Sequence, residues 1–381
     1  MKKILIFSDY YLPGFKGGGP IVSLSNMVRE ITAFSFKIIT RDHDLNSPPY
    51  PDIKRGKWNK IERAQVYYVT KKELNFFSLN SILNSVKFDL YYFNSIFSIF
   101  LTFLPLFLRK LKLIPSKPVI IAPRGVFFPG VWELKKFRKL VYISIFKLFN
   151  LHREIIWHAS NKLEKLTIQS IFRNEMKIFI APNLISSKLK GKFKKIRKEP
   201  GKLNILFMSR ISWKKNLDYA LNLLKFVKGE VKFEIYGPIE DKNYWKECKE
   251  IIENLPKNIN VKYKGVYIKK DGYNIFQNNH VFLFPTKGEN FGHVIFESLS
   301  EGCPVIISDQ TPWKDLQKRE IGWIFSLSNR SKFLDTLNKL IQMNNKEYQK
   351  ILGNISTYVD NILVNNSNSL NNLVKLFKSS L

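Results

Sequence analysis

The sequence predicts an α/β protein made of two Rossmann-like, doubly wound parallel-sheet domains. Short apolar runs alternate with helix-length segments almost from end to end, which is typical of parallel sheets covered on both faces. The alternation stops once, at the polar and strongly basic stretch 186–201, which is typical of a linker. A length of 381 residues suits two medium domains.

The first domain is expected over residues 1–185 and the second over 202–360, with the linker at 186–201. Strands of the first domain are expected at Ile4–Ser8, Lys37–Thr40, Gln65–Val69, Leu90–Phe93, Val119–Ala122, Ile155–His158 and Lys177–Ile180. Strands of the second are expected at Leu203–Phe207, Lys232–Tyr236, Val261–Tyr263, Val281–Phe284, Val305–Ser308 and Trp323–Phe325. Helical patterns lie between them, for example at Leu217–Val227 and Tyr244–Asn254, and the tail from about 361 to 381 is helical in pattern.

The formal net charge is +31, a field that favours polyanions such as nucleic acid or the anionic leaflet of a membrane. Lys is abundant throughout, so we attribute part of the charge to composition and the rest to membrane contact. The two cysteines, Cys248 and Cys303, lie far apart and indicate a reducing compartment. The five histidines form no metal-ligand spacing, so no metal site is expected. The segment 1–9 has the basic start of a signal peptide, but its short apolar run favours a first buried strand in a protein that is not exported.

The uncharged stretch from Tyr91 to Leu108 reaches the lower limit for a membrane span. Polar residues and Pro105 interrupt it, which favours a buried strand that runs into an apolar helix. An interfacial helix is the second interpretation and a spanning helix the third. The segment Val131–Arg153 interleaves aromatic and basic residues, so that a core helix with a solvated basic face and a membrane-contacting helix are equally compatible with it.

Two motifs of the second domain follow predicted strands, whose carboxyl ends bind ligands in sheets of this kind. After the first strand, Arg210 offers a planar fork and Lys215 a point charge, both suited to phosphate. After Val281–Phe284, the segment from Glu289 to Glu297 places two carboxylates around a glycine turn and a helix start that attracts anions. The carboxylates themselves are suited to hydroxyl groups on either side of a diphosphate, as in a sugar nucleotide. Surface cations and an acidic helix start are the simpler interpretations.

The first domain has weaker candidates. The loop Gly17-Gly18-Gly19 before a helix lets backbone amides approach a ligand, but it is not a nicotinamide fingerprint. Alone it is a weak signal, and the simpler interpretation is a mobile strand-to-helix turn. Arg124 ends a strand and either meets the ligand or pairs with a carboxylate. His158 also ends a strand, and a lone histidine is more often structural than catalytic. Asn183 is most simply a turn residue.

Together these residues resemble the retaining glycosyltransferases of family 4, the glycosyl transferases of group 1, which have the GT-B fold. The strings that carry the resemblance are Glu289-(seven residues)-Glu297, Ser209-Arg210 with Lys215-Asn216, Ala181-Pro182-Asn183, Pro123-Arg124-Gly125, and Gly302-Cys303-Pro304-Val305-Ile306. The longer string from Pro285 to Trp313 is similar to the subgroup of bacterial surface-polysaccharide assembly. The resemblance spans nearly the whole chain and is more specific in the second domain. Asn216 departs from a frequent glycine, and Gly237-Pro238 from a frequent Gly-x-Gly, which leaves the base of the donor open between uracil and guanine.

The resemblance implies that Arg210 and Lys215 neutralise a donor diphosphate and that Glu289 holds donor-sugar hydroxyls. Glu297 would bind the ribose. The donor-binding residues that the resemblance implies are Gly17, Gly18, Gly19, Arg210, Lys215, Gly237, Glu289, Asn290, Phe291, Gly292, His293 and Glu297. The catalytic residues that it implies are Glu289, Arg210, Lys215, Arg124 and His158. The helix at about 361–381 would pack back on the first domain, and the active site would lie between the domains.

The activity expected is therefore transfer of a hexose-type sugar from a nucleotide-diphosphate donor, with retention and without metal or cofactor. The acceptor expected is a polyprenyl-diphosphate-linked sugar or a polysaccharide of lipopolysaccharide O-antigen, capsule or exopolysaccharide. The expected location is the cytoplasm, on the inner face of the bacterial inner membrane. A nucleotide-sugar epimerase with the same architecture is one alternative. A nucleic-acid-binding protein is the other; it would explain the charge but not the acid pair, so no nucleic-acid partner is expected.

Overall fold

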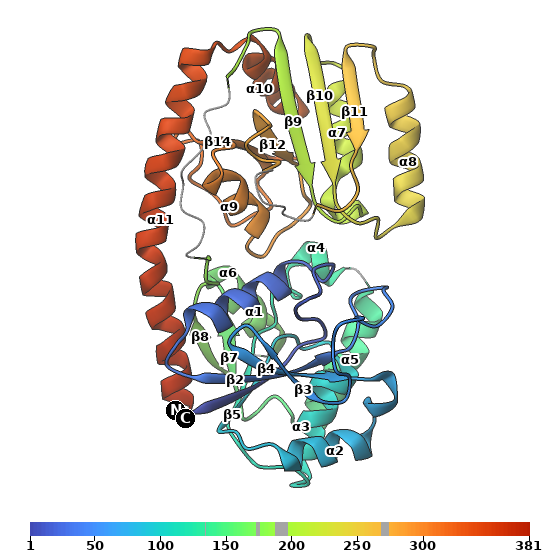
Figure 1. The fold of residues 1–381 in the computed structure, drawn as a ribbon, viewed down its shortest axis with the longest axis vertical. Coiled ribbons are helices and arrows are strands. Elements are labelled where there is room, and N and C mark those ends of the chain that lie inside the picture. Colours follow the sequence, from blue (N-terminus) through green and yellow to red (C-terminus); the bar gives the residue numbers. More distant parts are fainter. Residues whose placement is uncertain (134, 173–175, 187–196, 268–273) are drawn as a thin grey trace. The chain divides into compact units, whose positions relative to one another are not determined.

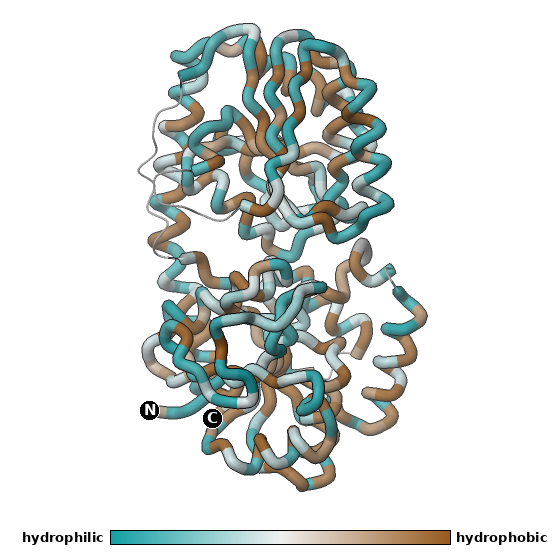
Figure 2. Tube along the Cα trace, turned by 45° about the vertical axis from the view of Figure 1, so that its right-hand side comes forward, coloured by the Kyte–Doolittle hydropathy of each residue, from teal (hydrophilic) through white to brown (hydrophobic). Residues whose placement is uncertain are grey.

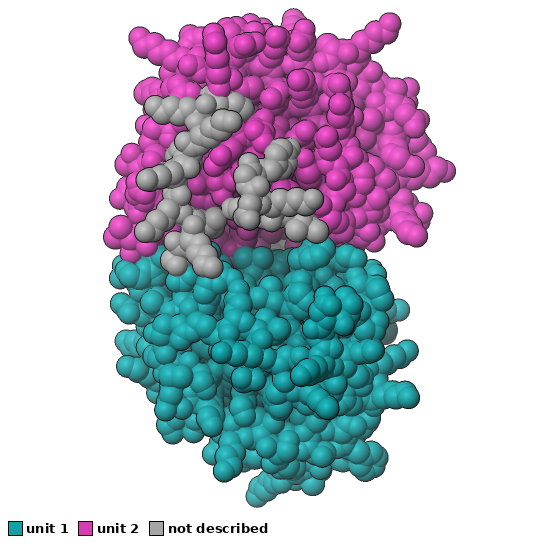
Figure 3. Space-filling view, in the orientation of Figure 1, with its two compact units in different colours: residues 1–186, 366–381 teal, residues 187–365 magenta. Residues whose placement is uncertain are grey.

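The computed structural model describes residues 1–133, 135–172, 176–186, 197–267 and 274–381 (Figure 1). The chain divides into two compact units, residues 1–186 with 366–381 and residues 187–365, which Figure 3 colours separately. Each unit is a sheet of mostly parallel strands with helices on its faces, so the predicted pair of Rossmann-like domains is confirmed. Most of the expected linker, residues 187–196, lies outside the described residues.

The sheet of the first unit has the strand order β3-β4-β2-β1-β5-β6-β7-β8. Its strands are β1 Lys3–Phe7, β2 Ser35–Arg41, β3 Trp58–Ile61, β4 Ala64–Val69, β5 Leu90–Phe93, β6 Val119–Ile121, β7 Ile155–Ala159 and β8 Lys177–Ile180. Its helices are α1 Gly19–Glu30, α2 Phe76–Ser85, α3 Leu104–Lys110, α4 Pro129–Trp132, α5 Lys136–Leu148 and α6 Lys162–Phe172, with short turns η1 Lys71–Glu73 and η2 Ile99–Phe103. The strand β3 was not predicted; it is an antiparallel edge strand, half-buried, and its short sequence lacks the apolar run that marks the buried strands.

The sheet of the second unit has the order β11-β10-β9-β12-β13-β14. Its strands are β9 Lys202–Met208, β10 Glu230–Tyr236, β11 Ile259–Tyr263, β12 Val281–Phe284, β13 Val305–Ser308 and β14 Gly322–Phe325. Its helices are α7 Leu217–Leu224, α8 Lys242–Glu253, α9 His293–Ser300 and α10 Arg330–Gln342, with the turn η3 Trp213–Lys215. The predicted helix Leu217–Val227 was three residues too long.

The last helix, α11, runs over Asn345–Ser380, so the tail is helical from well before residue 361. Its final turns belong to the first unit, where Leu373, Leu376 and Phe377 are buried. The Phe377 ring meets Phe34 edge-on, with ring centroids 5.5 Å apart.

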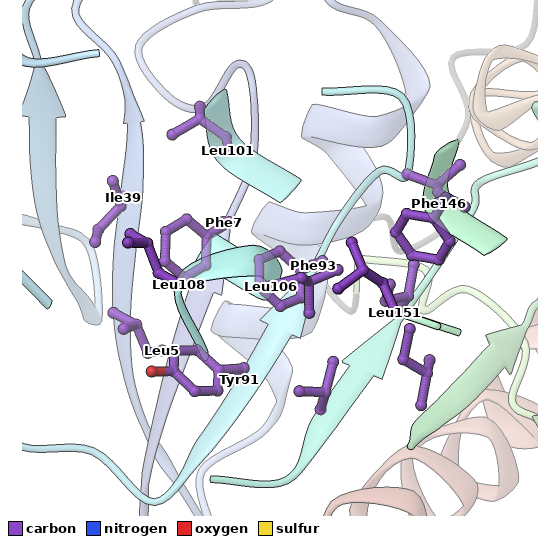
Figure 4. Packing of buried hydrophobic residues seen from close by; sticks show 14 of the residues in the cluster. Leu5, Phe7, Ile39, Tyr91, Phe93, Leu101, Leu106, Leu108, Phe146 and Leu151 are labelled. Atoms are coloured by element: carbon purple, nitrogen blue, oxygen red, sulfur yellow. The ribbon is translucent and has the colours of Figure 1, made fainter. Parts of the chain in front are cut away.

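Side chains of β1 alternate between the two faces of the first sheet, as the period of a strand requires. Ile4 and Ile6 enter one core cluster, and Leu5 and Phe7 enter the other. In the second cluster Phe7 stacks on Phe93, with centroids 4.9 Å apart, beneath the apolar helix α3 (Figure 4). The uncharged stretch from Tyr91 therefore forms a buried strand, the π-helical turn η2 and α3, in agreement with the favoured interpretation. Among the described residues, no helix combines the length and apolarity needed to cross a bilayer.

Candidate active site

The strand ends of the second unit bring its predicted residues together. Arg210 follows β9, Gly237 follows β10 and Glu289 follows β12, and β9 pairs with both β10 and β12 in parallel. These loops therefore leave the same edge of one sheet, the edge at which α/β proteins bind ligands. Backbone hydrogen bonds tie the loops to one another: Ile211 N to Pro238 O (2.8 Å), Lys287 N to Lys214 O (2.9 Å) and Glu289 N to Gln310 O (3.0 Å).

Lys215 and Glu289 form an ion pair at the centre of this edge. The Lys215 ammonium donates to Oε1 of Glu289, and the two side chains are only 12% and 14% exposed. The ammonium also lies 5.4 Å from the centroid of the Phe284 ring. Burial alone would raise the pKa of the Glu289 carboxyl, but the charges of Lys215 and Lys214 outweigh it and hold that pKa below its ordinary value. The carboxylate is thus ionised at neutral pH and serves as an acceptor of hydrogen bonds.

Arg210 is held by a carboxylate that the sequence analysis did not identify. Its Nη1 donates to Oε1 of Glu240 at 2.7 Å, in the loop after β10. The charge of Arg210 also contributes to the lowered pKa of Glu289. Glu240 stands three residues after Gly237, and only this position beside a strand end could have marked it.

Two residues near the pair have backbone conformations that explain their identity. Asn216 has φ +62°, in the left-handed region that glycine adopts most easily and asparagine tolerates. Its Nδ2 donates to Pro285 O at 2.8 Å and fixes the loop after β12. Gly237 has φ +136°, and a Cβ there would lie 1.8 Å from Ser209 O. Asn216 therefore departs from a frequent glycine but keeps the left-handed backbone that favours glycine, and Gly237 stands where only glycine fits.

Gly292, with φ +74°, is the N-cap of α9, so the helix starts directly after the turn that follows Glu289. Trp313 holds this turn in place, because its Nε1 donates a hydrogen bond to Phe291 O at 2.6 Å. The rings of Phe291 and His293 lie 4.6 Å apart. Glu297 lies one turn into α9 and is half-buried, as is Asn290. The helix start that was predicted to attract anions is therefore present and lies next to Glu289.

The first unit holds Arg124 in a separate hydrogen-bond network. The left-handed Arg124, with φ +59°, donates to Asn94 Oδ1 at 2.7 Å, to Tyr92 Oη at 2.9 Å and to Asn183 Oδ1. Asn94 and Asn183 are buried. Asn183 is thus a partner of Arg124 as well as a turn residue, and neutral groups rather than a carboxylate orient the guanidinium.

His158 continues this network and is buried. Nε2 lies 2.8 Å from Ala181 O, which can only accept, so Nε2 carries the proton and Nδ1 accepts from the Tyr92 hydroxyl at 2.8 Å. Burial, helped by the charge of Arg124, lowers the pKa of His158 to about 3. The imidazole is neutral with both nitrogens bonded. Through its bond to the Tyr92 hydroxyl, which in turn accepts from Arg124, His158 supports this network, and a catalytic role for it stays a prediction.

The loop Gly17-Gly18-Gly19 is anchored by a residue that the sequence analysis missed. The buried Asp44 carboxylate accepts from Phe15 N at 2.7 Å and Lys16 N at 2.8 Å, just before the glycines. Gly18, with φ +70°, precedes α1. The only signal of Asp44 in the sequence is its place after a predicted strand.

Comparisons with known proteins agree with this arrangement. Residues 190–356 match the family model described as glycosyl transferases group 1. The chain is 26% identical over 301 residues, 76% of this chain and 80% of the relative, to an uncharacterized 41.2 kDa protein in the cps region of Klebsiella pneumoniae.

Two solved structures share the fold. Alr3699/HepE of Anabaena, solved in complex with UDP and glucose, is 14% identical with a TM-score of 0.72, and 100% of each chain is covered. WaaG, a glycosyltransferase involved in lipopolysaccharide biosynthesis, is 11% identical with a TM-score of 0.66, over 94% of this chain and 95% of that one. The resemblance to the group 1 glycosyl transferases and the GT-B fold are thereby confirmed.

Proposed function

We propose that this glycosyl transferase moves a hexose-type sugar from a nucleotide-diphosphate donor to a lipid-linked or polysaccharide acceptor, with retention at the anomeric carbon. The observation that carries the proposal is the Lys215–Glu289 ion pair, next to Arg210 and the start of α9. A cation pair and a helix start suit a diphosphate, and a neighbouring ionised carboxylate suits the hydroxyls of the attached sugar. Glu297, further along α9, would bind the ribose hydroxyls.

In the proposed reaction, the bond between the anomeric carbon and the phosphate oxygen breaks while the acceptor oxygen bonds to the same face of the sugar. The departing phosphate takes the acceptor's proton. Negative charge grows on the leaving phosphate, and Arg210 and Lys215 stabilise it; groups oriented in advance toward developing charge usually contribute most to the rate of such a reaction. Glu289 forms an ion pair with Lys215, which we assign to the donor diphosphate. We therefore do not assign Glu289 the role of a glycosidase carboxylate, two of which flank the scissile bond.

We propose that the two cations replace a metal ion at the diphosphate. The residues that the structure describes contain no group of three His, Cys, Asp or Glu suited to hold one. Activity that survives exhaustive chelation is the expected result, and activity restored only by a divalent cation would contradict it.

The proposed setting is assembly of lipopolysaccharide O-antigen, capsule or exopolysaccharide at the inner face of the inner membrane. A relative in a cps region and a fold shared with a lipopolysaccharide glycosyltransferase support this setting. A polyprenyl-diphosphate-linked acceptor would require the enzyme to lie on the membrane surface.

The donor is tested by a thermal-shift screen of UDP-glucose, UDP-galactose and GDP-mannose. At least one should raise the melting temperature of the wild type, and Lys215→Ala and Glu297→Ala should abolish that shift. Lys202→Ala is the matched control, because Lys202 starts β9, the strand that leads to Arg210. Within the described part of the chain, the Lys202 side chain forms only an exposed ion pair with Glu199. Equal shifts in wild type and Lys215→Ala would refute the assigned site.

A further inference from the structure

Helix α5 of the first unit has two apolar faces, one of which is exposed. Ile143 and Phe146 are buried in the core cluster beneath the sheet. On the outward side Phe137 is 78% exposed and Leu148 is 76% exposed. Leu140, Val141 and Ile145 are also exposed, and at 100° per residue they fall in one stripe with the first two. Figure 2 shows hydrophobic and hydrophilic positions interleaved along this helix. A helix on the surface of a globular protein needs only one apolar face, the one that packs on the core.

This stripe consists of Phe137, Leu140, Val141, Ile145 and Leu148 and is called the α5 face below. Cations border it on both sides. Arg138 falls on one side of it, and Lys136 and Lys147 fall on the other. Glu133 is the acid nearest in sequence, and it pairs with Lys136 at 3.0 Å while both remain exposed. Arg138 has no acidic partner among the described residues. The outward side of α5 is thus apolar with basic borders, and the helix contains no acidic residue.

The segments next to α5 also expose apolar and basic side chains. The Phe107 ring of α3 lies 5.2 Å from that of Phe149, which directly follows α5. The turn that ends α3 exposes Leu111 and Leu113, which alternate with the cations Lys110 and Lys112. Exposed apolar side chains and cations therefore occur together on two adjoining elements. They form a patch, in contrast to the single exposed apolar residues that are common on protein surfaces.

We propose that the α5 face docks on an anionic lipid bilayer, with its apolar stripe in the boundary between headgroups and acyl chains. This deepens the membrane location proposed above and rests on it. A helix with an exposed apolar stripe and basic borders is suited to lie in that plane, and each cation near an anionic surface contributes about 1 kcal/mol. The 13 residues of α5 span about 20 Å, too short to cross a hydrocarbon core of about 30 Å.

The test is co-sedimentation of the full chain with vesicles of phosphatidylcholine alone or with phosphatidylglycerol, at low and high salt. The wild type should bind only the anionic vesicles and lose binding at high salt. The double variant Phe137→Ser/Leu148→Ser should lower the partition coefficient about tenfold, and Arg138→Glu about fivefold or more. The matched control is Phe77→Ser: Phe77 is 81% exposed on α2, a helix of the same unit without charged residues.

Three outcomes would overturn the proposal: equal loss of binding in Phe77→Ser, no preference for anionic vesicles, or a dimer that Phe137→Ser/Leu148→Ser dissociates while vesicles do not bind. The last would identify the α5 face as a contact between copies of the chain. The thermal shift with UDP-glucose or another donor is measured on the same variants. A loss of vesicle binding with an intact donor shift separates this inference from the transferase assignment.

Discussion

Lys215 and Glu289 lie 74 residues apart in the chain and form an ion pair where the loops after β9 and β12 meet. Each was expected to meet a donor, but neither was expected to meet the other. The pairing means that the cation is already oriented before the proposed diphosphate donor binds. It also keeps a nearly buried carboxylate ionised, which suits it to accept sugar hydroxyls.

We expect Lys215→Ala to lower the free energy of unfolding by about 2–3 kcal/mol, because the largely buried Glu289 carboxylate loses its direct partner. The double variant Lys215→Ala/Glu289→Ala should cost less than the sum of the single variants, with a coupling of about 1–2 kcal/mol. Urea unfolding of all four proteins measures this cycle. Strictly additive costs would show that the pair contributes nothing to stability.

Gly237→Ala should destabilise the protein by about 3–5 kcal/mol. The added Cβ meets Ser209 O at 1.8 Å, and the backbone has φ +136°, so both overpacking and strain oppose it. Gly201→Ala is the control, since Gly201 has φ +84° but open space around it, and about 1–2 kcal/mol is expected. Similar unfolding midpoints for the two variants would contradict the close approach of the loops after β9 and β10.

Asn216→Gly should cost about 1 kcal/mol, because the left-handed backbone is kept and only the hydrogen bond to Pro285 O is lost. Asn216→Ala should cost about 1–2 kcal/mol more, since alanine is strained at φ +62°. Chemical denaturation compares the three proteins. The reverse order would mean that the side chain, and not the backbone, selects the residue.

The neutral state of His158 predicts a pH dependence of stability. Its pKa is about 3 in the folded protein and about 6.5 in the unfolded chain, so the unfolded chain binds more protons between these values. Stability should therefore fall as the pH decreases below about 6.5, by up to about 1.4 kcal/mol per pH unit from this group. His158→Gln, which does not titrate, should show a shallower slope of melting temperature against pH. An imidazole NMR signal of His158 that titrates near pH 6.5 would disprove the assignment.

Most strands could be predicted, because a strand buried on both faces needs a short, continuous apolar run, as in Val281–Phe284. The edge strand β3 could not be predicted, since it is half-buried and its sequence contains no continuous apolar run. The early start of α11 at Asn345 was missed, although Tyr348, Leu352, Ile355 and Val359 recur there at helical spacing and are buried. The π-helical turn η2 has no signal in the sequence, which shows only an apolar segment.

The grouping of the candidate residues at one edge of the second sheet could be predicted from strand ends alone, because every parallel strand delivers its following loop to the same edge of the sheet. The sequence by itself thus determined the two-sheet architecture and the candidate residues of each unit. Only tertiary structure decided their partners: Glu240 for Arg210, Tyr92 for His158 and Asp44 for the glycine loop. These contacts join loops far apart in the chain, and their choice depends on strand order and loop paths, which local patterns of residues do not encode.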